Sequence, residues 1–200
     1  SLSMVEFPLG LMTKTEVRAA AARAGLGVAQ KRDSQEVCFI PDNDYASFVA
    51  AEASRIGLDA SGDLVDTAGK VIGRHGEYYR YTIGQRRGLG VALGSSRYVV
   101  AVDAGSRAVT IGTNDDLMSH SLVAAGASWV AGVPPGDGTE CTVRVRNGHE
   151  GAPGRLFTTG GGASFRVEFK SPVRAIAPGQ AAVVYDGDRV LGGGWMEGRG

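Results

Sequence analysis

The sequence is poor in cysteine, has no net charge and lacks a long apolar run. Its 200 residues contain two cysteines, Cys38 and Cys141, too few and too far apart for a disulfide framework. The 21 basic and 21 acidic residues balance, so any nucleic-acid binding must depend on a local patch. No apolar stretch approaches the roughly 18 residues of a membrane span, and the opening residues lack the pattern of a signal peptide. We therefore expect a protein of the reducing cytoplasm that does not enter a membrane.

Histidine is also scarce, and the three histidines are isolated. His75, His120 and His149 have no partner residues at metal-ligand spacing, so no metal site is expected. Glycine, in contrast, is abundant at 31 residues, which favours turn-rich β structure over helix bundles. The composition therefore predicts a mainly β protein, and the only helix signals lie in an N-terminal α-helical segment.

The first helix signal is a capping box. Thr13 and Glu16 have the spacing at which each side chain bonds to the backbone of the other, and Gly25 ends the predicted helix. Between them runs a narrow stripe of valine and alanine, which predicts close packing against another element. Residues 28–30 are predicted to follow as an extended segment.

A second helix is predicted over residues 44–55, after the break at Pro41. Asp42 or Asn43 is expected to cap its N-terminus. The two helices together have too few apolar residues for a core of their own. Residues 1–57 therefore look like the tail of a larger α/β domain.

From residue 58 onward the pattern changes to short strands and glycine turns. Residues 139–146 and 164–170 alternate apolar and polar side chains, which is typical of strands with one buried face. Further strands are predicted at residues 71–72, 78–82, 97–104, 107–112, 117–125, 181–185 and 189–191. Short strands at this spacing suggest a barrel. We therefore expect a small central β domain at residues 58–117 and a C-terminal β-barrel of the six-stranded type at residues 118–200.

The candidate nucleophile lies in residues 31–42, which read KRDSQEVCFIPD. Lys31 and Arg32 precede Cys38 and would favour its thiolate form. A lone cysteine is more often a buried structural residue, so both interpretations of Cys38 stay open. Cys141 falls on the apolar face of a predicted strand, where a structural role is expected.

A glycine-rich loop, YTIGQRRGLG at residues 81–90, is the first candidate phosphate site. Its glycines bracket Gln85, Arg86 and Arg87, and backbone amides together with guanidinium groups can bind phosphate. The glycine spacing fits neither a dinucleotide fingerprint nor a P-loop. A solvated turn is the alternative interpretation.

The predicted barrel carries a second candidate. Arg144 and Arg146 lie on the polar face of their strand, and Gln180 follows a Pro-Gly turn. The two arginines could bind phosphates while the glutamine contacts a sugar or a base edge. Solvated arginines on the outside of a barrel are the alternative.

Five stretches taken together resemble the tRNA-specific 2-thiouridylase family. They follow one another in order over nearly the whole chain. The stretches are FPLG with TKTEVR (residues 7–18), KRDSQEVCFIPD (31–42), YTIGQRRGLG (81–90), APGQAAVVYDGD (177–188) and LGGG (191–194).

Members of this family put sulfur on the wobble uridine of certain tRNAs. The resemblance implies an N-terminal ATP-pyrophosphatase domain that uses ATP with magnesium to adenylate the 2-oxygen of the uridine. It implies that Cys38 carries a persulfide, received from a sulfur-relay protein or a cysteine desulfurase, whose terminal sulfur displaces AMP with the help of a second cysteine. The partner would be tRNA for lysine, glutamate or glutamine.

The resemblance also implies how the tRNA is held. A small central β domain and a C-terminal barrel similar to elongation-factor barrels would hold it, with contacts from Arg146 and Gln180 and from the position of Asn147. The family usually has an aromatic and then a basic residue after the arginine, whereas this chain has Asn147 and Gly148.

The family's Ser-Gly-Gly-x-Asp-Ser phosphate loop does not occur in these 200 residues. Cys141 cannot be the second catalytic cysteine, because it lies in a predicted barrel strand. We therefore expect the C-terminal part of the enzyme, with no cofactor of its own and no activity alone. Two other interpretations stay open: a non-catalytic RNA-binding barrel with a structural Cys38, and a translation-factor-like barrel that binds protein domains.

Overall fold

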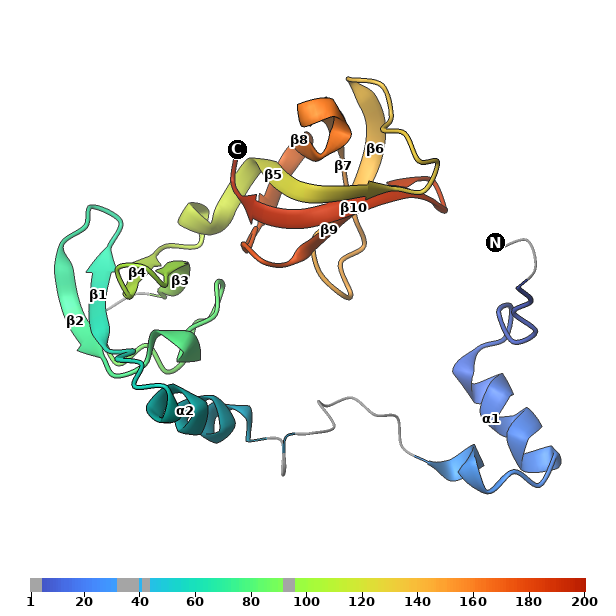
Figure 1. Cartoon of the computed structure of the whole chain (residues 1–200), viewed down its shortest axis with the longest axis horizontal. Helices are drawn as coiled ribbons and strands as arrows, with labels where there is room; N and C mark the ends of the chain where they lie inside the picture. The colour runs from blue at the N-terminus through green and yellow to red at the C-terminus, as the bar shows by residue number, and fades with distance from the viewer. Residues whose placement is uncertain (1–4, 32–39, 41–43, 92–95) are drawn as a thin grey trace. The chain divides into compact units, whose positions relative to one another are not determined.

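The computed structural model describes residues 5–31, 40, 44–91 and 96–200 (Figure 1). The chain divides into two compact units, residues 1–56 and 57–200. Cys38 and the predicted caps Asp42 and Asn43 lie outside the described residues.

Helix α1 spans Lys14–Arg23 and begins with the predicted capping box. The Thr13 amide donates to the Glu16 carboxylate at 2.7 Å, and the Glu16 amide donates to the Thr13 hydroxyl at 3.4 Å. None of the α1 residues is buried within the described structure. The prediction of an extended segment after α1 was wrong, because Gly27–Gln30 forms a 3-10 turn (η2), closed by the bond from the Ala29 amide to the Leu26 carbonyl.

Helix α2 spans Tyr45–Arg55, close to its predicted range, but its cap is neither of the two predicted residues. Asp44 caps the helix, and its carboxylate accepts a hydrogen bond from the Ser47 amide at 3.0 Å. The side chain of an N-cap residue accepts a hydrogen bond from the amide two or three positions into the helix, and Asp44 stands at that position relative to Ser47. Of the α2 residues only Ala53 is buried, so the helix presents most of its surface outward in unit 1.

A four-stranded sheet opens the second unit. Its strands are β1 (Gly62–Asp66), β2 (Val71–His75), β3 (Tyr98–Asp103) and β4 (Ala108–Gly112), in the order β2-β1-β4-β3. Strands β1 and β4 run parallel, and the other pairs are antiparallel, including the predicted β3–β4 hairpin. A small core lies on this sheet, formed by Leu64, Leu89, Val99, Val109 and Ile111.

The predicted strand at residues 78–82 is wrong. Tyr78–Arg80 forms a 3-10 turn, η4, because the Tyr81 amide bonds back to the Tyr78 carbonyl at 3.1 Å. Two of the aromatic residues that suggested a strand, Tyr78 and Tyr81, pack against the small core.

The C-terminal residues form a closed, six-stranded antiparallel barrel, as predicted (Figure 1). Its strands are β5 (Met118–Trp129), β6 (Thr139–Arg144), β7 (Ala152–Thr159), β8 (Ser164–Arg174), β9 (Ala181–Asp186) and β10 (Arg189–Gly198). Around the barrel they follow the order β10-β5-β8-β7-β6-β9. Closure leaves the barrel without a free sheet edge.

Strand β7 was not predicted. Pro153 and Gly154 interrupt its pattern, although Ala152, Gly154 and Leu156 are buried in alternation. A Cβ on Gly154 would stand 2.6 Å from the Glu168 carbonyl oxygen, so β7 passes β8 too closely for any side chain there. Gly154 makes β7 hard to recognise in the sequence, and the packing of β7 against β8 requires this glycine.

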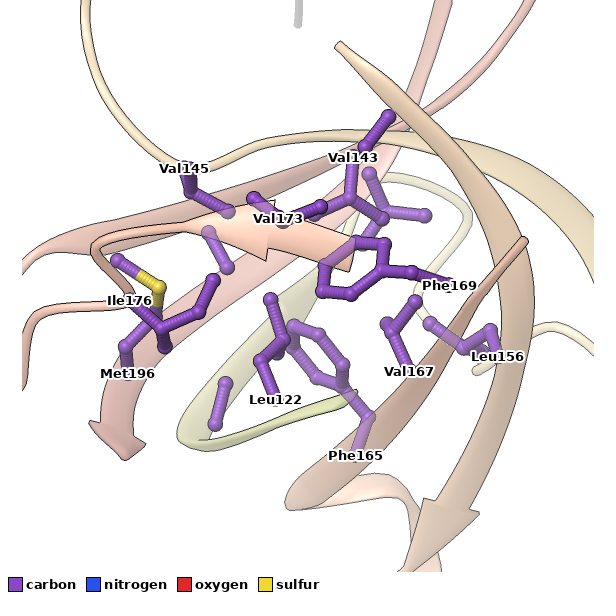
Figure 2. Packing of buried hydrophobic residues seen from close by; sticks show 14 of the residues in the cluster. Leu122, Val143, Val145, Leu156, Phe165, Val167, Phe169, Val173, Ile176 and Met196 are labelled. Carbon is purple, nitrogen blue, oxygen red and sulfur yellow. The ribbon is translucent and has the colours of Figure 1, made fainter. Parts of the chain in front are cut away.

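The barrel interior is filled by apolar side chains from all six strands. Phe165, only 1% exposed, lies beside Leu122 and Val167 (Figure 2). Cys141 belongs to the same core, as predicted, with its sulfur 3.7 Å from the Gly154 carbonyl oxygen. Burial raises the pKa of the Cys141 thiol to about 11, so this thiol stays protonated and unreactive at neutral pH.

Candidate nucleic-acid interface

The outer surface of the barrel is hollowed where β6 meets β9. Arg144, the last residue of β6, is the Cα partner of Val183 on β9. Its guanidinium stacks over the Tyr185 ring, 5.0 Å from the ring centroid. A planar cation on an aromatic face keeps its N–H edges free to bind an anion.

Arg146 continues the same face beyond the end of β6. Val145 between the two arginines is buried, so strand alternation turns both guanidinium groups outward. One Arg146 nitrogen, Nη1, donates to the Arg174 carbonyl at 3.1 Å. This bond holds the guanidinium in place and leaves most of its five N–H donors for a ligand.

The hollow between these residues has a volume of about 260 Å³. It is lined by Arg144, Arg146, Asn147, Gly148, Gln180, Ala181, Val183 and Tyr185. We call it the arginine hollow. Its lining contains two cations and no acidic residue, so the local field favours an anion despite the neutral charge of the whole chain.

Four of the seven candidate RNA contacts therefore line one hollow: Arg144, Arg146, Asn147 and Gln180. Gln180 is exposed in a turn that the Met196 amide fixes by donating to the Gln180 carbonyl at 2.8 Å. Sequence reasoning missed Tyr185, whose signal is its position two residues after Val183 on the outward face of β9.

His149 stands beside the arginine hollow. Its amide donates to the Arg146 carbonyl at 3.3 Å, and its ring is half-buried. Burial lowers the pKa of His149, and the positive charges of Arg146 and Arg144 lower it further, against a small opposite effect of Glu150. The ring is therefore neutral at pH 7 and can take up a proton when an anion offsets the arginines.

No residue of the loop at residues 81–90 lines the arginine hollow. The Gln85 side chain lies in its own loop, where its Oε1 accepts from the Thr82 amide at 2.9 Å and its Nε2 donates to the Arg87 carbonyl at 3.0 Å. It lines a different hollow of about 290 Å³ together with Glu77 and Arg80. Arg86 and Arg87 are exposed on the loop.

Within residues 5–31, 40, 44–91 and 96–200, no three histidine, cysteine, aspartate or glutamate side chains gather closely enough to hold an ion. In the part of the chain that the structure describes, no helix is long and apolar enough to cross a membrane.

Three sequence families match consecutive parts of the chain. Residues 1–42 match the tRNA methyl transferase HUP domain, residues 53–113 the tRNA methyl transferase PRC-barrel domain, and residues 119–196 the aminomethyltransferase beta-barrel domain. The tRNA-specific 2-thiouridylase MnmA of Solibacter usitatus is 44% identical over 98% of this chain. The chain belongs to the tRNA-specific 2-thiouridylase family.

Other thiouridylases agree with this assignment. The enzymes of Geotalea uraniireducens and Sorangium cellulosum are 47% and 49% identical over 98% and 96% of the chain. The matches cover 54%, 51% and 50% of the three thiouridylases, so the chain spans about half the length of these relatives.

Proposed function

We propose that this chain holds tRNA on the arginine hollow and supplies the sulfur that becomes the 2-thio group of the wobble uridine. The observation that carries the first half is the meeting of Arg144, Arg146 and Gln180 on one exposed hollow without an acidic residue. Two guanidinium groups suit phosphates, and an exposed amide suits a sugar or base edge. The thiouridylase relatives support tRNA as the substrate.

We assign the sulfur to Cys38. A persulfide on Cys38 attacks C2 of the activated uridine through its terminal sulfur, so the C2–S bond forms and the C2–O bond to AMP breaks. A second thiol then attacks the Cys38 sulfur, breaks the S–S bond and leaves the outer sulfur on the uridine, while the two cysteines form a disulfide. Cys141 is unsuited to either part, because it is buried and its pKa is about 11.

Activation of the uridine requires ATP with magnesium, and these 200 residues contain no phosphate loop. We assign that step to the sequence that the relatives have beyond the matched half, and we expect the 200 residues alone to bind tRNA without thiolating it. The persulfide would come from a sulfur-relay protein or a cysteine desulfurase. A thiol that must stay reduced between turnovers fits the cytoplasm.

Sulfur transfer and tRNA binding can be tested separately. In the intact protein, Cys38→Ser should abolish 2-thiouridine formation, measured by mass spectrometry of digested tRNA, while tRNA affinity stays unchanged. Cys141→Ala is the matched control and should retain thiolation. Thiolation by Cys38→Ser at the wild-type rate would refute the role of Cys38 and favour a non-catalytic RNA-binding barrel.

The binding half is tested with the 200-residue chain and an unmodified tRNA transcript in a filter-binding assay. Arg146→Ala should weaken binding about tenfold, because a charge-assisted hydrogen bond contributes about 1.5–3 kcal/mol. Arg155→Ala is the control, since Arg155 is an exposed barrel arginine on β7 outside the hollow. Equal loss in both variants would contradict a site at the arginine hollow.

A further inference from the structure

A second hollow lies on the same outer surface of the barrel, and it is apolar. Its volume is about 340 Å³, and its floor is the glycine run Gly192–Gly194 of β10. Cβ atoms on Gly193 and Gly194 would stand 2.6 and 2.8 Å from backbone oxygens of the neighbouring strands. Neither position can therefore take a side chain without a shift of its neighbours, and the floor is bare backbone. We call this the glycine hollow.

One wall of the glycine hollow is an exposed tryptophan. Trp195 is 62% exposed, and its Cδ1 lies 3.5 Å from the position that a Cβ on Gly126 would take. Val130, which is 66% exposed, also lines the hollow. Leaving a large aromatic ring in water costs the burial energy it would otherwise contribute.

The other tryptophan, Trp129, packs against the barrel core. The Trp129 indole donates its Nε1–H to the Gly162 carbonyl at 2.7 Å and packs against the Phe165 ring, 5.5 Å between centroids. The barrel thus uses one tryptophan for its core and presents the other, Trp195, on its outer surface.

The two hollows adjoin each other. Ala181 and Val183 line both of them. The strand register gives the same result: Arg144 is paired with Val183 across β6 and β9, and Val183 is paired with Gly193 across β9 and β10. Two strand spacings separate the arginine from the glycine floor, roughly 10 Å. Neighbouring units of one nucleic-acid strand can therefore reach both hollows.

We propose that an unpaired base of the bound RNA stacks on Trp195 over the glycine floor while Arg144 and Arg146 hold adjacent phosphates. This inference rests on the proposed tRNA binding and adds the site for a base. An apolar floor with an aromatic wall fits the face of any base, and stacking of this kind tolerates all four. The glycine hollow would thus contribute affinity without reading sequence.

The test uses the 200-residue chain and two short probes, a uridine oligonucleotide and a ribose-phosphate chain of equal length without bases. Trp129→Phe leaves Trp195 as the only tryptophan, and Trp195→Phe leaves Trp129. The uridine oligonucleotide should quench the fluorescence of Trp195 and leave that of Trp129 unchanged. The abasic chain should bind with the same salt dependence but without quenching.

Affinity gives a second readout. Trp195→Ala should weaken binding of the uridine oligonucleotide about tenfold, since stacking contributes about 1–3 kcal/mol per base. Trp195→Phe should keep most of the affinity, and neither change should alter the salt dependence, because no phosphate contact is removed. Circular dichroism and the melting temperature confirm that the variants fold.

The outcomes separate this inference from the proposed function. Salt-dependent binding with unchanged Trp195 fluorescence and no effect of Trp195→Ala would overturn the stacked base and leave the arginine hollow intact. No binding of either probe, or of tRNA, would overturn both. If Trp195→Ala abolished self-association of the chain in sedimentation and left RNA binding unchanged, the glycine hollow would be a protein contact and the inference would be wrong.

Discussion

Two pairs of arginines in this chain look similar in sequence and differ in the structure. Arg86 and Arg87 are adjacent in a glycine-rich loop and exposed, whereas Arg144 and Arg146 are two positions apart on one face of the barrel. The barrel pair has neighbours that fix it: the Tyr185 ring under Arg144 and the Arg174 carbonyl at Arg146. Pre-organised side chains lose less entropy on binding. Arginines therefore become a site where the fold orients them on one surface.

The largest expected difference is between these two pairs. Arg144→Ala with Arg146→Ala should weaken tRNA binding about a hundredfold, because two charge-assisted contacts of about 1.5 kcal/mol each are lost. Arg86→Ala with Arg87→Ala should weaken it less than about threefold, as for solvated surface charges. Filter binding at fixed salt measures both. Equal losses would show that the loop contributes as much as the barrel.

The two glutamines of the candidate sites should also differ. Gln85→Ala removes two hydrogen bonds inside the loop, so we expect a loss of about 1 kcal/mol of stability with little change in tRNA affinity. Gln180→Ala should lower the affinity several-fold and leave the melting temperature unchanged. Thermal denaturation and tRNA binding of both variants distinguish these roles. If the Gln85→Ala variant kept its melting temperature but bound tRNA more weakly, Gln85 would be a tRNA contact and this prediction would be wrong.

The stacking of Arg144 on Tyr185 predicts a smaller effect. Tyr185→Leu removes the aromatic face and should weaken tRNA binding about threefold, since an exposed cation–π contact contributes about 0.5–1 kcal/mol. Tyr185→Phe keeps the ring and serves as the matched control. If leucine and phenylalanine gave the same affinity, the stacking would not orient Arg144 for binding.

The smallest expected effect is a pH dependence of tRNA affinity that comes from His149 beside the arginine hollow and has no counterpart at Arg86 and Arg87. The pKa of His149 is lowered in the folded chain by burial and by Arg146 and Arg144, and phosphates in the arginine hollow would oppose the effect of the arginines. Binding should therefore take up a proton, and tRNA affinity should rise slightly as the pH falls from 7.5 toward 5.5. His149→Asn should flatten this rise. A steeper rise in the variant would exclude His149 as its source.

The lowered pKa of His149 also determines how the stability of the protein without RNA changes with pH. Because the folded pKa of His149 lies below the unfolded value of about 6.5, the unfolded chain takes up the proton first as the pH falls below 6.5. The contribution of His149 to stability is therefore retained above pH 6.5 and is lost progressively below it. Urea denaturation of wild type and His149→Asn across this range measures the difference.

Much of the fold could be predicted from alternation. Residues 139–146 and 164–170 predicted β6 and β8 because each has one apolar face, and the barrel followed from strand spacing. Strand β7 was not predicted because Gly154 interrupts its pattern. This glycine is required by the close approach of β8, and the local sequence of β7 does not reveal that contact. The prediction at residues 78–82 was wrong for a related reason, since Tyr78 and Tyr81 pack against the small core while their segment forms a 3-10 turn.

The site was predictable only in part. Strand alternation placed Arg144 and Arg146 on one face, and the Pro-Gly turn pointed to Gln180. The family resemblance added Asn147, and the fold brings all four residues to the same hollow. The position of Tyr185 under Arg144 depends on the register of β6 with β9. The hydrogen bonds of the Gln85 side chain to the Thr82 amide and the Arg87 carbonyl depend on the path of the loop backbone, which residue types alone do not determine.

The salt dependence of tRNA binding tests the central claim most directly. For the 200-residue chain, the logarithm of the association constant should fall linearly with the logarithm of salt concentration, in proportion to the number of phosphates contacted. Removing Arg144 and Arg146 together should reduce the magnitude of that slope by about two, while removing Arg86 and Arg87 should leave it unchanged. A slope that is the same in wild type and in the Arg144→Ala, Arg146→Ala variant would contradict phosphate binding at the arginine hollow.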